Sequence, residues 1–548
     1  MIVRRNPYIE LGKRYDTVKT FTLPVSGSVL LFGPEIDIVR TREFQRLAGI
    51  KQLGTSYVVY RGALHTRFEH SLGTLHQAER MLRAVQANPR DPYPVSDRAL
   101  RFARLGALLH DLTHVPFGHT LEDELQLLRR HDLNQPRIRR LLINSEIGRI
   151  LKRSMGGDDF LQLCAVLNAK TDSQFAELEF PFVGDVVGNT VCADLLDYVQ
   201  RDLLACGLPS ALGDRFLDYL SVTSQDEGLP VDHSRLVLNL NKRGMPRPDV
   251  ESEVVKLLTY RYELAERVYF HHAKNAASVM IGRAVQEAGL AMGLPTPPRL
   301  DANFLWVSDE LLLAGLAHPE VESAIGLMAD PQSIGDRSLA SRLAKGVQQR
   351  DLYKIAYLVT WDDIPDAVAR LASVYQTPDE RRELEDQLAD LAGVRRGRVL
   401  VHIPAQRMMS KDADVRVRTG RGEIVKLHEW DGNHSQRLSA LNEAHGRLWR
   451  VMVYVHPAEE GLAPIVRAAA EDRFQAPSQY VPGERTSRYQ QAVFDSLSER
   501  WHLDVEDGDA LSDAAYAPAD TRRSVERAIL AAVRRRRRDA GGPPLQKR

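Results

Sequence analysis

Cysteine is scarce in this sequence. Only three cysteines occur among 548 residues, at positions 164, 192 and 206. Their uneven spacing fits neither a disulfide framework nor a zinc site built from paired thiolates, which excludes the disulfide-rich secreted class of proteins. We therefore predict a reducing, cytoplasmic environment for the chain.

The chain also lacks an excess of charge of either sign, and it lacks long apolar runs. Lysine plus arginine and aspartate plus glutamate both number 73. Nothing in the overall charge indicates a nucleic-acid coat or a protein held to a membrane surface. No apolar run resembles a signal peptide or is long enough to span a bilayer. We expect a soluble intracellular protein without a membrane partner.

Length and apolar periodicity predict a mostly α-helical protein. A chain of 548 residues is long enough to bury at least one large core. Across residues 41–394 apolar side chains recur every three or four positions, which is the spacing of amphipathic helices. Helices are predicted over Arg98–His110, Leu121–Arg130, Ile138–Lys152 and Asp185–Cys206. A capping box at Thr377–Glu380 starts another helix, which ends at Gly393.

Three other segments differ from this helical region. Residues 1–40 carry short β-like pieces at Phe21–Pro24 and Ser28–Phe32. Residues 395–475 form a small α+β module, with strands predicted at Val399–Ile403, Asp414–Arg418, Glu423–Leu427 and Trp449–Val455, and a helix at Ser439–Leu448. Residues 476–548 form an irregular tail with a short helix at Asp520–Val533. The arginine run Arg534–Arg538 then favours a solvated, disordered end over a nucleic-acid-binding arm.

Histidine and aspartate gather in one apolar helical stretch. His110 and Asp111 are adjacent near its end, and two more histidines, His114 and His119, follow. Neutral imidazole and carboxylate together suit divalent ions such as Mn, Fe, Ni or Zn. Upstream, His70 lies in an amphipathic segment. Downstream, Asp194 lies among apolar residues, where an unpaired carboxylate is costly to bury.

In this order His70, His110-Asp111 and Asp194 resemble the H…HD…D signature of the HD-domain metal-dependent phosphohydrolases. Longer segments are similar to the deoxynucleoside triphosphate triphosphohydrolase branch, which includes bacterial dGTPases and the sterile-alpha-motif HD enzymes; they are Phe44–Gly54, Arg67–Gly73, His110–His119 and Asp194–Asp202. The resemblance covers residues 35–460. It implies an HD-domain helical core with a small C-terminal α+β module, and one divalent ion (Mn, Fe, Ni, Zn or Mg) held by His70, His110, Asp111 and Asp194.

The resemblance also implies catalytic roles around this cluster. His119 is expected to protonate the leaving group or assist the attacking water, while Glu122, one helical turn later, holds its imidazole. His114 is expected nearer the substrate phosphates, with a loop or capping histidine as the alternative. His131, followed by an acidic residue, resembles a second catalytic histidine, and an exposed turn is the alternative there.

Arginines and a short polar set are expected to bind the substrate. Arg67 precedes His70 by three positions and resembles a phosphate-gripping arginine of the family, a role that a planar guanidinium suits. Arg267 lines up with another such arginine, with a solvated helix face as the alternative. Tyr198 and Asp202 resemble residues that meet the sugar 3′-hydroxyl.

Gln52 and Leu53 match the pair that lies under the deoxyribose in the family, where an apolar side chain leaves a 2′-hydroxyl no room. Other positions depart from the family pattern. Leu195 stands where the sterile-alpha-motif enzymes use a phosphate-binding lysine, and Ala48 stands where they bind a regulatory nucleotide through arginine. These departures leave the grip on triphosphate open and give no support for activation by nucleotide.

The leading hypothesis is a metal-dependent hydrolase that converts deoxynucleoside triphosphates to deoxynucleoside and triphosphate (EC 3.1.5 type). Two alternatives stay open. One is an HD-domain phosphohydrolase acting on another nucleotide or on single-stranded nucleic acid, and the other is a non-catalytic nucleotide sensor. The expected partners are a nucleotide substrate and further copies of the chain in a homo-oligomer.

Overall fold

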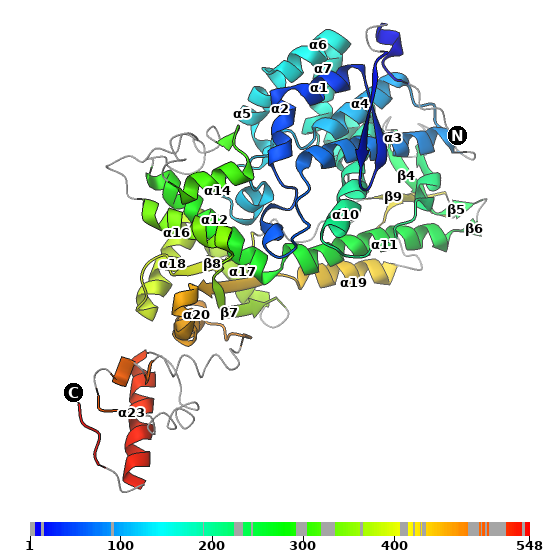
Figure 1. Ribbon diagram of the computed structural model, residues 1–548. Coiled ribbons are helices and arrows are strands. Elements are labelled where there is room, and N and C mark those ends of the chain that lie inside the picture. Colours follow the sequence, from blue (N-terminus) through cyan, green and yellow to red (C-terminus); the bar gives the residue numbers. More distant parts are fainter. Residues whose placement is uncertain are drawn as a thin grey trace.

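The computed structural model describes residues 6–12, 16–88, 92–189, 191–223, 234–242, 245–291, 304–318, 335–361, 365–405, 415–419, 422–427, 429, 435–480, 493–494, 496–498, 501–503, 522–539 and 543–547. Helices build most of the body, and four small sheets accompany them (Figure 1). The prediction of a mostly α-helical protein is confirmed. Among the described residues, no helix combines the length and apolarity needed to cross a bilayer.

The first two strands of the chain form an antiparallel hairpin. Strands β1 (Val18–Leu23) and β2 (Gly27–Phe32) pair where the short β-like pieces are predicted. Helix α1 (Gly33–Arg40) follows directly, although the sequence suggests β-like structure up to residue 40. Its start is fixed by Glu35, whose carboxylate accepts a hydrogen bond from the backbone N–H of Phe32 at 3.0 Å.

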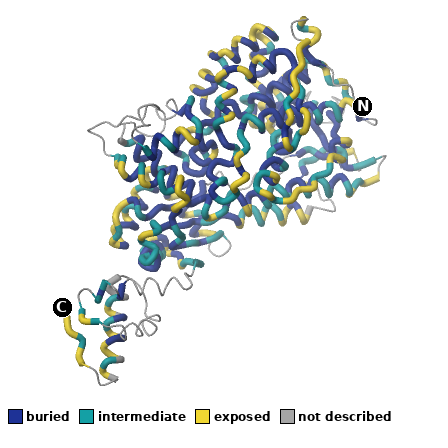
Figure 2. Tube along the Cα trace, in the orientation of Figure 1, coloured by how far each residue is buried: buried dark blue, intermediate teal, exposed yellow. Residues whose placement is uncertain are grey.

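Three long helices form the centre of the body and carry the motifs predicted to bind metal. They are α3 (Arg67–Ala87), α4 (Asp97–Leu109) and α10 (Ala193–Ala205), and α3 packs against both α4 and α10. Helix α4 begins at Ser96, whose hydroxyl accepts from the backbone N–H of Ala99 at 3.1 Å. The helix ends at Leu109, so His110 and Asp111 lie where the chain leaves it. Buried residues fill this region (Figure 2).

Three predicted helices are wrong in extent. The segment Leu121–Arg130 forms only a π-turn, Thr120–Glu124, because the chain then adopts a left-handed conformation at Gln126, with φ of 56°. The Ile138–Lys152 prediction merges the end of a helical turn with α6 (Glu146–Met155), whose N-terminus is capped by Ser145. The Asp185–Cys206 prediction joins α9 (Pro181–Gly188) to α10 across an interruption. A left-handed residue ends the first segment and Ser145 caps α6, while α10 begins after Cys192 without a side-chain cap. Apolar periodicity registers none of these breaks.

A second helical cluster packs beside the first. Helices α12 (His272–Ala291), α14 (Asp309–Ala317) and α16 (Arg337–Gln349) surround a core of small and aliphatic side chains. The turn at residues 117–128 inserts its own apolar side chains into this same core. The loop that follows the His110-Asp111 motif is therefore held between two helical clusters.

The predicted strands of residues 395–475 belong to two different sheets. Strand β11 (Arg450–Val455) pairs on one side with β8 (Val399–His402) and on the other with β7 (Lys354–Thr360), a strand inside the segment expected to be helical. Strands β9 (Arg416–Arg418) and β10 (Ile424–Lys426) extend a sheet with β4 (Leu236–Asn239) and β3 (Leu220–Val222). Each of the two sheets therefore contains strands from before and after residue 394. The predicted domain boundary at residue 394 does not coincide with a break in strand pairing.

Helices cover the β7-β11-β8 sheet. Among them, α18 (Pro378–Ala392) begins with the predicted capping box, in which Thr377 and Glu380 each accept from the other's backbone N–H, and it ends at Gly393 in a left-handed conformation. Helix α19 (Ser435–Gly446) lies along α11 (Pro248–Leu264). The capping-box prediction is confirmed at both ends.

Helix α23 (Arg522–Asp539) lies apart from the main body (Figure 1). It includes Arg534–Arg538, so the expectation of a disordered arginine run is wrong. Its residues Ile529 and Val533 are buried and belong to an apolar cluster, whereas Arg534, Arg535 and Arg538 are exposed. Residues 481–492 and 504–521, which make up much of the predicted irregular tail, lie outside the described residues.

Candidate functional site

Three of the four predicted metal ligands meet at one point. His70 comes from α3, His110 follows the last residue of α4, and Asp194 lies in the first turn of α10. One ligand atom from each lies within 4.8 Å of the others. His70 Nε2 is 3.0 Å from Asp194 Oδ1, and His110 Nε2 is 3.7 Å from the same oxygen. Packing of α3 against α4 and α10 therefore assembles residues that lie 124 positions apart in sequence.

The hydrogen bonds of these two histidines orient them for a cation. His70 Nδ1 lies 2.9 Å from Asp197 Oδ2, and His110 Nδ1 lies 2.8 Å from the Ala107 carbonyl oxygen. Both Nδ1 atoms therefore carry a proton and donate, which directs the two Nε2 atoms toward Asp194, where a cation could replace a proton between them. His110 Nε2 is buried and has no hydrogen-bond partner among the described residues. This donor set fits a divalent metal ion.

Asp111 lies at the edge of this group. Its Oδ1 is 3.5 Å from His110 Nε2, and its Oδ2 is 3.8 Å from His70 Nε2. Oδ2 also accepts a hydrogen bond from the guanidinium of Arg67. That guanidinium holds the pKa of Asp111 well below its usual range, although burial opposes the shift. Asp111 is thus ionised and adjacent to the cluster, as its predicted role as a ligand requires.

Negative charge dominates the electrostatics of the cluster. Burial lowers the pKa of His70, but hydrogen bonds to Asp194 and Asp197 outweigh burial and raise it to about 10. Burial by itself raises the pKa of Asp194. The hydrogen bonds and positive charges of His110 and His70 outweigh burial and hold this pKa well below its usual range. The carboxylates therefore attract positive charge at the point that the two Nε2 atoms face.

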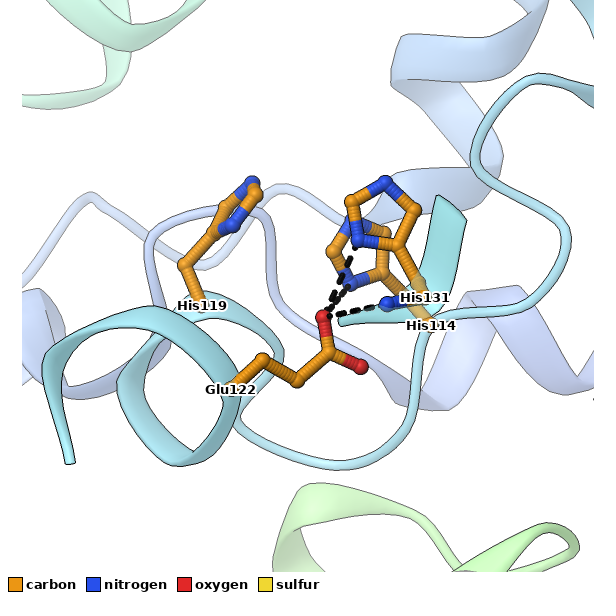
Figure 3. A group of neighbouring side chains, drawn as sticks. All are labelled: His114, His119, Glu122 and His131. Atoms are coloured by element: carbon orange, nitrogen blue, oxygen red, sulfur yellow. Dashed lines mark hydrogen bonds and ion pairs between the residues drawn. The ribbon is translucent and has the colours of Figure 1, made fainter. Parts of the chain in front are cut away.

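A second group contains the predicted catalytic residues (Figure 3). His114, His119, Glu122 and His131 each offer an atom within 4.8 Å of the others, so this group could also hold an ion. Glu122 Oε2 lies 3.0 Å from His131 Nδ1 and 3.3 Å from His114 Nδ1. The rings of His114 and His131 stack, with their centroids 3.5 Å apart. His131 is therefore part of the site, and the alternative of an exposed turn is excluded.

The predicted pairing of Glu122 with His119 is wrong. His119 Nδ1 instead lies 2.6 Å from Asp123 Oδ2, and the His119 side chain is about half exposed. The turn at residues 120–124 is a π-turn, which directs Glu122 inward, toward His114 and His131. Glu122 is fully buried, and Arg137 donates to its Oε1 at 2.5 Å.

His114 links the two groups. Its Nε2 is 3.3 Å from Asp111 Oδ1, on the side opposite Glu122. Burial, together with the positive charges of Arg67 and His131, lowers the pKa of His114 to about 3. His114 is therefore a neutral imidazole between two carboxylates. Thr113 donates its hydroxyl to the His131 carbonyl at 2.8 Å and so connects the two histidine segments.

The predicted substrate-binding residues are only partly assembled. Arg67 is buried and donates a hydrogen bond to Asp111. Its Nε has no hydrogen-bond partner among the described residues. Two backbone hydrogen bonds join the Gln52–Leu53 segment to the start of α3. The Gln52 N–H donates to the His65 carbonyl, and the Arg67 N–H donates to the Ile50 carbonyl. The Gln52 side-chain oxygen is also buried without a partner among these residues.

Asp202 and Arg267 differ from expectation. Both oxygens of Asp202 already have partners, His65 Nε2 at 2.8 Å and the Tyr269 hydroxyl at 3.0 Å. Tyr198 lies one turn before Asp202 on α10 and is partly buried. Arg267 lies on a π-turn and is exposed to solvent, which matches the alternative of a solvated face. The contacts to sugar and phosphate stay predictions for these residues.

Several residues that build the site carry no recognisable sequence signal. Asp197 orients His70, and Arg201 fixes Asp197 through two nitrogens at 2.7 and 2.8 Å. Asp123 holds His119, and Arg137 holds Glu122. The i to i+4 spacing of Asp197 and Arg201 indicates an ion pair. The contact of Asp197 with His70, a predicted metal ligand, depends on the packing of α3, which lies about 125 residues earlier in the sequence.

Comparisons with known proteins identify parts of the chain. Residues 67–179 match the HD domain family, and residues 327–480 match the HD-associated region. The mouse deoxynucleoside triphosphate triphosphohydrolase SAMHD1 is 23% identical over 415 residues, covering 70% of this chain and 62% of the relative. The uncharacterized protein YwfO of Bacillus subtilis is 32% identical over 252 residues, covering 46% of this chain and 51% of the relative.

A crystal structure of a hypothetical protein from Aquifex aeolicus shares the fold. Its TM-score is 0.55 at 20% identity, and the match covers 81% of this chain and 98% of that one. The chain spans about half the length of the curated relatives that it matches first. The predicted resemblance to HD-domain, deoxynucleotidase-like enzymes is confirmed.

Proposed function

Because this chain contains an HD domain with its associated region, we propose that it is a metal-dependent hydrolase of deoxynucleoside triphosphates, releasing deoxynucleoside and triphosphate. One observation carries the proposal. The Nε2 atoms of His70 and His110 face Asp194 while both Nδ1 atoms are occupied by acceptors. That arrangement favours a divalent ion held by His70, His110, Asp194 and Asp111.

A divalent ion bound there would polarise a phosphoryl group and lower the pKa of a bound water. The residues around it supply the remaining chemistry. Arg67 is a non-titrating cation beside Asp111 and can bind a phosphate oxygen through its unpartnered nitrogen. His119 is the half-exposed imidazole of the group, with Asp123 fixing its Nδ1, so its Nε2 can exchange a proton with a leaving group or a water.

His114 and His131 have a different role from His119. Both rings contact Glu122, and His114 is neutral. His131 Nδ1 lies 3.0 Å from Glu122 Oε2 and its Nε2 lies 3.9 Å from Asp111 Oδ1, so His131 is suited to orienting a water next to Asp111. His114 is fully buried between Glu122 and Asp111 and supports the His131 ring by stacking. Glu122 and Arg137 keep that orientation fixed.

A different nucleotide is the second candidate substrate. Leu195 is buried in the core, so α10 presents no cation at the position where a phosphate-binding lysine is expected. Lys274, another cation near the site, is buried and paired with Glu124. Arg67 would thus be the main cation that binds the triphosphate. A substrate with fewer phosphates needs fewer cations, and this observation favours another phosphate ester as the alternative.

A product assay tests the proposal. The purified protein with Mn²⁺ is incubated with a panel of dNTPs, rNTPs and oligonucleotides, and the products are separated by ion-exchange chromatography and identified by phosphorus NMR. We expect deoxynucleoside plus triphosphate, and loss of turnover in Asp111→Ala. Asp159→Ala, which removes a carboxylate paired with Arg98 away from both groups, is the matched control. Pyrophosphate or monophosphate as the product would contradict the triphosphohydrolase proposal. Bound metal without any turnover would favour the nucleotide sensor.

A further inference from the structure

Asp309 connects two loops of the site from a distant part of the chain. It lies in the first turn of α14 and is 1% exposed. Its Oδ2 accepts a hydrogen bond from the backbone N–H of Lys51 at 2.8 Å, and its Oδ1 accepts from the backbone N–H of Phe117 at 2.8 Å. One carboxylate therefore holds two segments that are 66 residues apart in sequence.

The two segments that Asp309 holds carry different functions in the proposed enzyme. Lys51 directly precedes Gln52 and Leu53, the pair expected under the deoxyribose. Phe117 lies between His114 and His119 on the loop of expected catalytic residues. The separation between substrate sugar and catalytic imidazoles thus depends on one shared carboxylate. Lys51 also forms a bridge with Thr66, which adjoins Arg67.

Glycines let the same segments approach each other and α14 closely. A side chain at Gly54, which has φ of +50°, would place Cβ 2.9 Å from Thr120 Oγ1, so the two loops are in contact there. At Gly49 a Cβ would lie 2.7 Å from Ser308 Cβ, next to Asp309. Phe117 itself has φ of 57°, a strained conformation for a side-chain-bearing residue, which needs an external contact to persist.

The physical setting makes the Asp309 contacts strong. Backbone N–H groups that donate to a buried carboxylate form charge-assisted hydrogen bonds. The N-terminus of α14, capped by the Ser308 hydroxyl at 3.1 Å from the Leu311 N–H, favours a negative side chain in its first turn. The Lys51 ammonium lies 3.9 Å from the carboxylate and helps to balance its charge.

We propose that Asp309 is a positioning residue that sets the distance between the sugar-binding loop and the catalytic-histidine loop. It thereby contributes to discrimination between deoxyribose and ribose. The inference about discrimination rests on the proposed function, whereas the clamp between the loops does not. Asp309 touches neither the metal ligands nor the expected position of the substrate, so its effect passes through Lys51 and Phe117.

Hydrogen exchange measured by mass spectrometry tests the clamp without reference to any substrate. Asp309→Asn replaces one acceptor oxygen with a donor that repels a backbone N–H. We expect faster exchange in peptides covering residues 49–54 and 115–120, with unchanged protection in α3. Glu310→Gln is the matched control, because the exposed Glu310 side chain forms an ion pair with the Lys51 ammonium and is the chain neighbour of Asp309. Equal protection of both peptides in Asp309→Asn and wild type would overturn the clamp.

Kinetics with dATP and ATP test the positioning role. In Asp309→Asn we expect kcat/KM for dATP to fall about 10- to 100-fold, the usual cost of a small misplacement, with metal content unchanged. The ratio of dATP to ATP turnover should fall with it, which a general loss of stability would not produce. Gly49→Ala, which presses the same loop away from Ser308, should reproduce the lower ratio if Asp309→Asn does not fold.

An unchanged dATP-to-ATP ratio in both variants, despite faster exchange, would overturn the positioning role. If the wild-type protein turns over neither nucleotide, the proposed function fails. The exchange data then still decide whether Asp309 clamps the two loops.

Discussion

His70 Nδ1 lies 2.9 Å from Asp197 Oδ2, and both side chains are fully buried. This contact turns the Nε2 lone pair of His70 toward Asp194 and Asp111. Asp197 is in turn held by Arg201 and by the Ser26 hydroxyl, which lies 3.3 Å from its other oxygen. The orientation of one metal ligand thus depends on a helix and a hairpin far from it in sequence.

Asp197→Asn is expected to weaken metal binding about 10- to 100-fold, the usual effect of removing the group that orients a ligating histidine. An asparagine can present its amide nitrogen to His70 and so disfavour the required tautomer. Metal content after dialysis, measured by mass spectrometry against a chelator series, checks the change. Ser26→Ala, which removes only the weaker contact to Asp197, should retain nearly all of its metal. Full metal retention by Asp197→Asn would refute this role.

Glu122→Gln and Asp123→Asn separate the two histidine environments. Glu122 serves His114 and His131, so its neutralisation should lower kcat about 10²-fold or more, within the range of general acid–base contributions. Asp123 contacts the half-exposed His119, so Asp123→Asn should lower kcat less than Glu122→Gln does. Steady-state kinetics across pH would measure both. Equal defects in the two variants would show that the imidazoles work as one unit.

Gly118→Ala is expected to abolish activity while leaving the protein folded. Gly118 has φ of +35°, and an added Cβ would lie 2.9 Å from Arg67 Nη2 and 3.2 Å from His114 Nδ1. Gly156→Ala is the control, because Gly156 has φ of +88° with no atom within 4 Å of an added Cβ. Both substitutions should cost about 1–2 kcal/mol of unfolding free energy through backbone strain. A Gly118→Ala protein with wild-type turnover would contradict the tight packing of Arg67 against this turn.

His402 is expected to make the protein sensitive to acid. Burial, together with the charges of Lys274 and Arg381, lowers the pKa of His402 to about 3. The unfolded chain binds this proton near pH 6.5, so the stability that neutral His402 contributes is present above pH 6.5 and is lost as pH falls toward 3. The loss is about 1.4 kcal/mol per pH unit.

Urea unfolding at pH 7, 6 and 5 measures this slope. His402→Gln should flatten it, whereas His502→Gln, which changes an exposed imidazole, should keep the wild-type slope. Identical slopes in all three proteins would show that other groups govern the acid sensitivity.

Some of the fold followed from local sequence rules. The helix at residues 98–110, the capping box at Thr377 and the hairpin before residue 33 all formed as expected, because neighbouring residues determine them. The strand β7 was missed, because its position in a sheet depends on β8 and β11, which lie far along the chain. The helix predicted over residues 121–130 failed for a similar reason, since its apolar residues pack into the core around α12.

By itself the sequence indicated a divalent-ion site at His110-Asp111 through its ligand chemistry. The resemblance to the HD-domain enzymes added His70 and Asp194 as predicted ligands. Only the tertiary structure decided which carboxylate serves which histidine. A π-turn directs Glu122 to His114 and His131 and leaves His119 to Asp123. The tertiary structure also placed Asp197 next to His70 Nδ1, and it placed Asp309 between two loops. These contacts depend on helix packing across long sequence separations, and no local pattern encodes them.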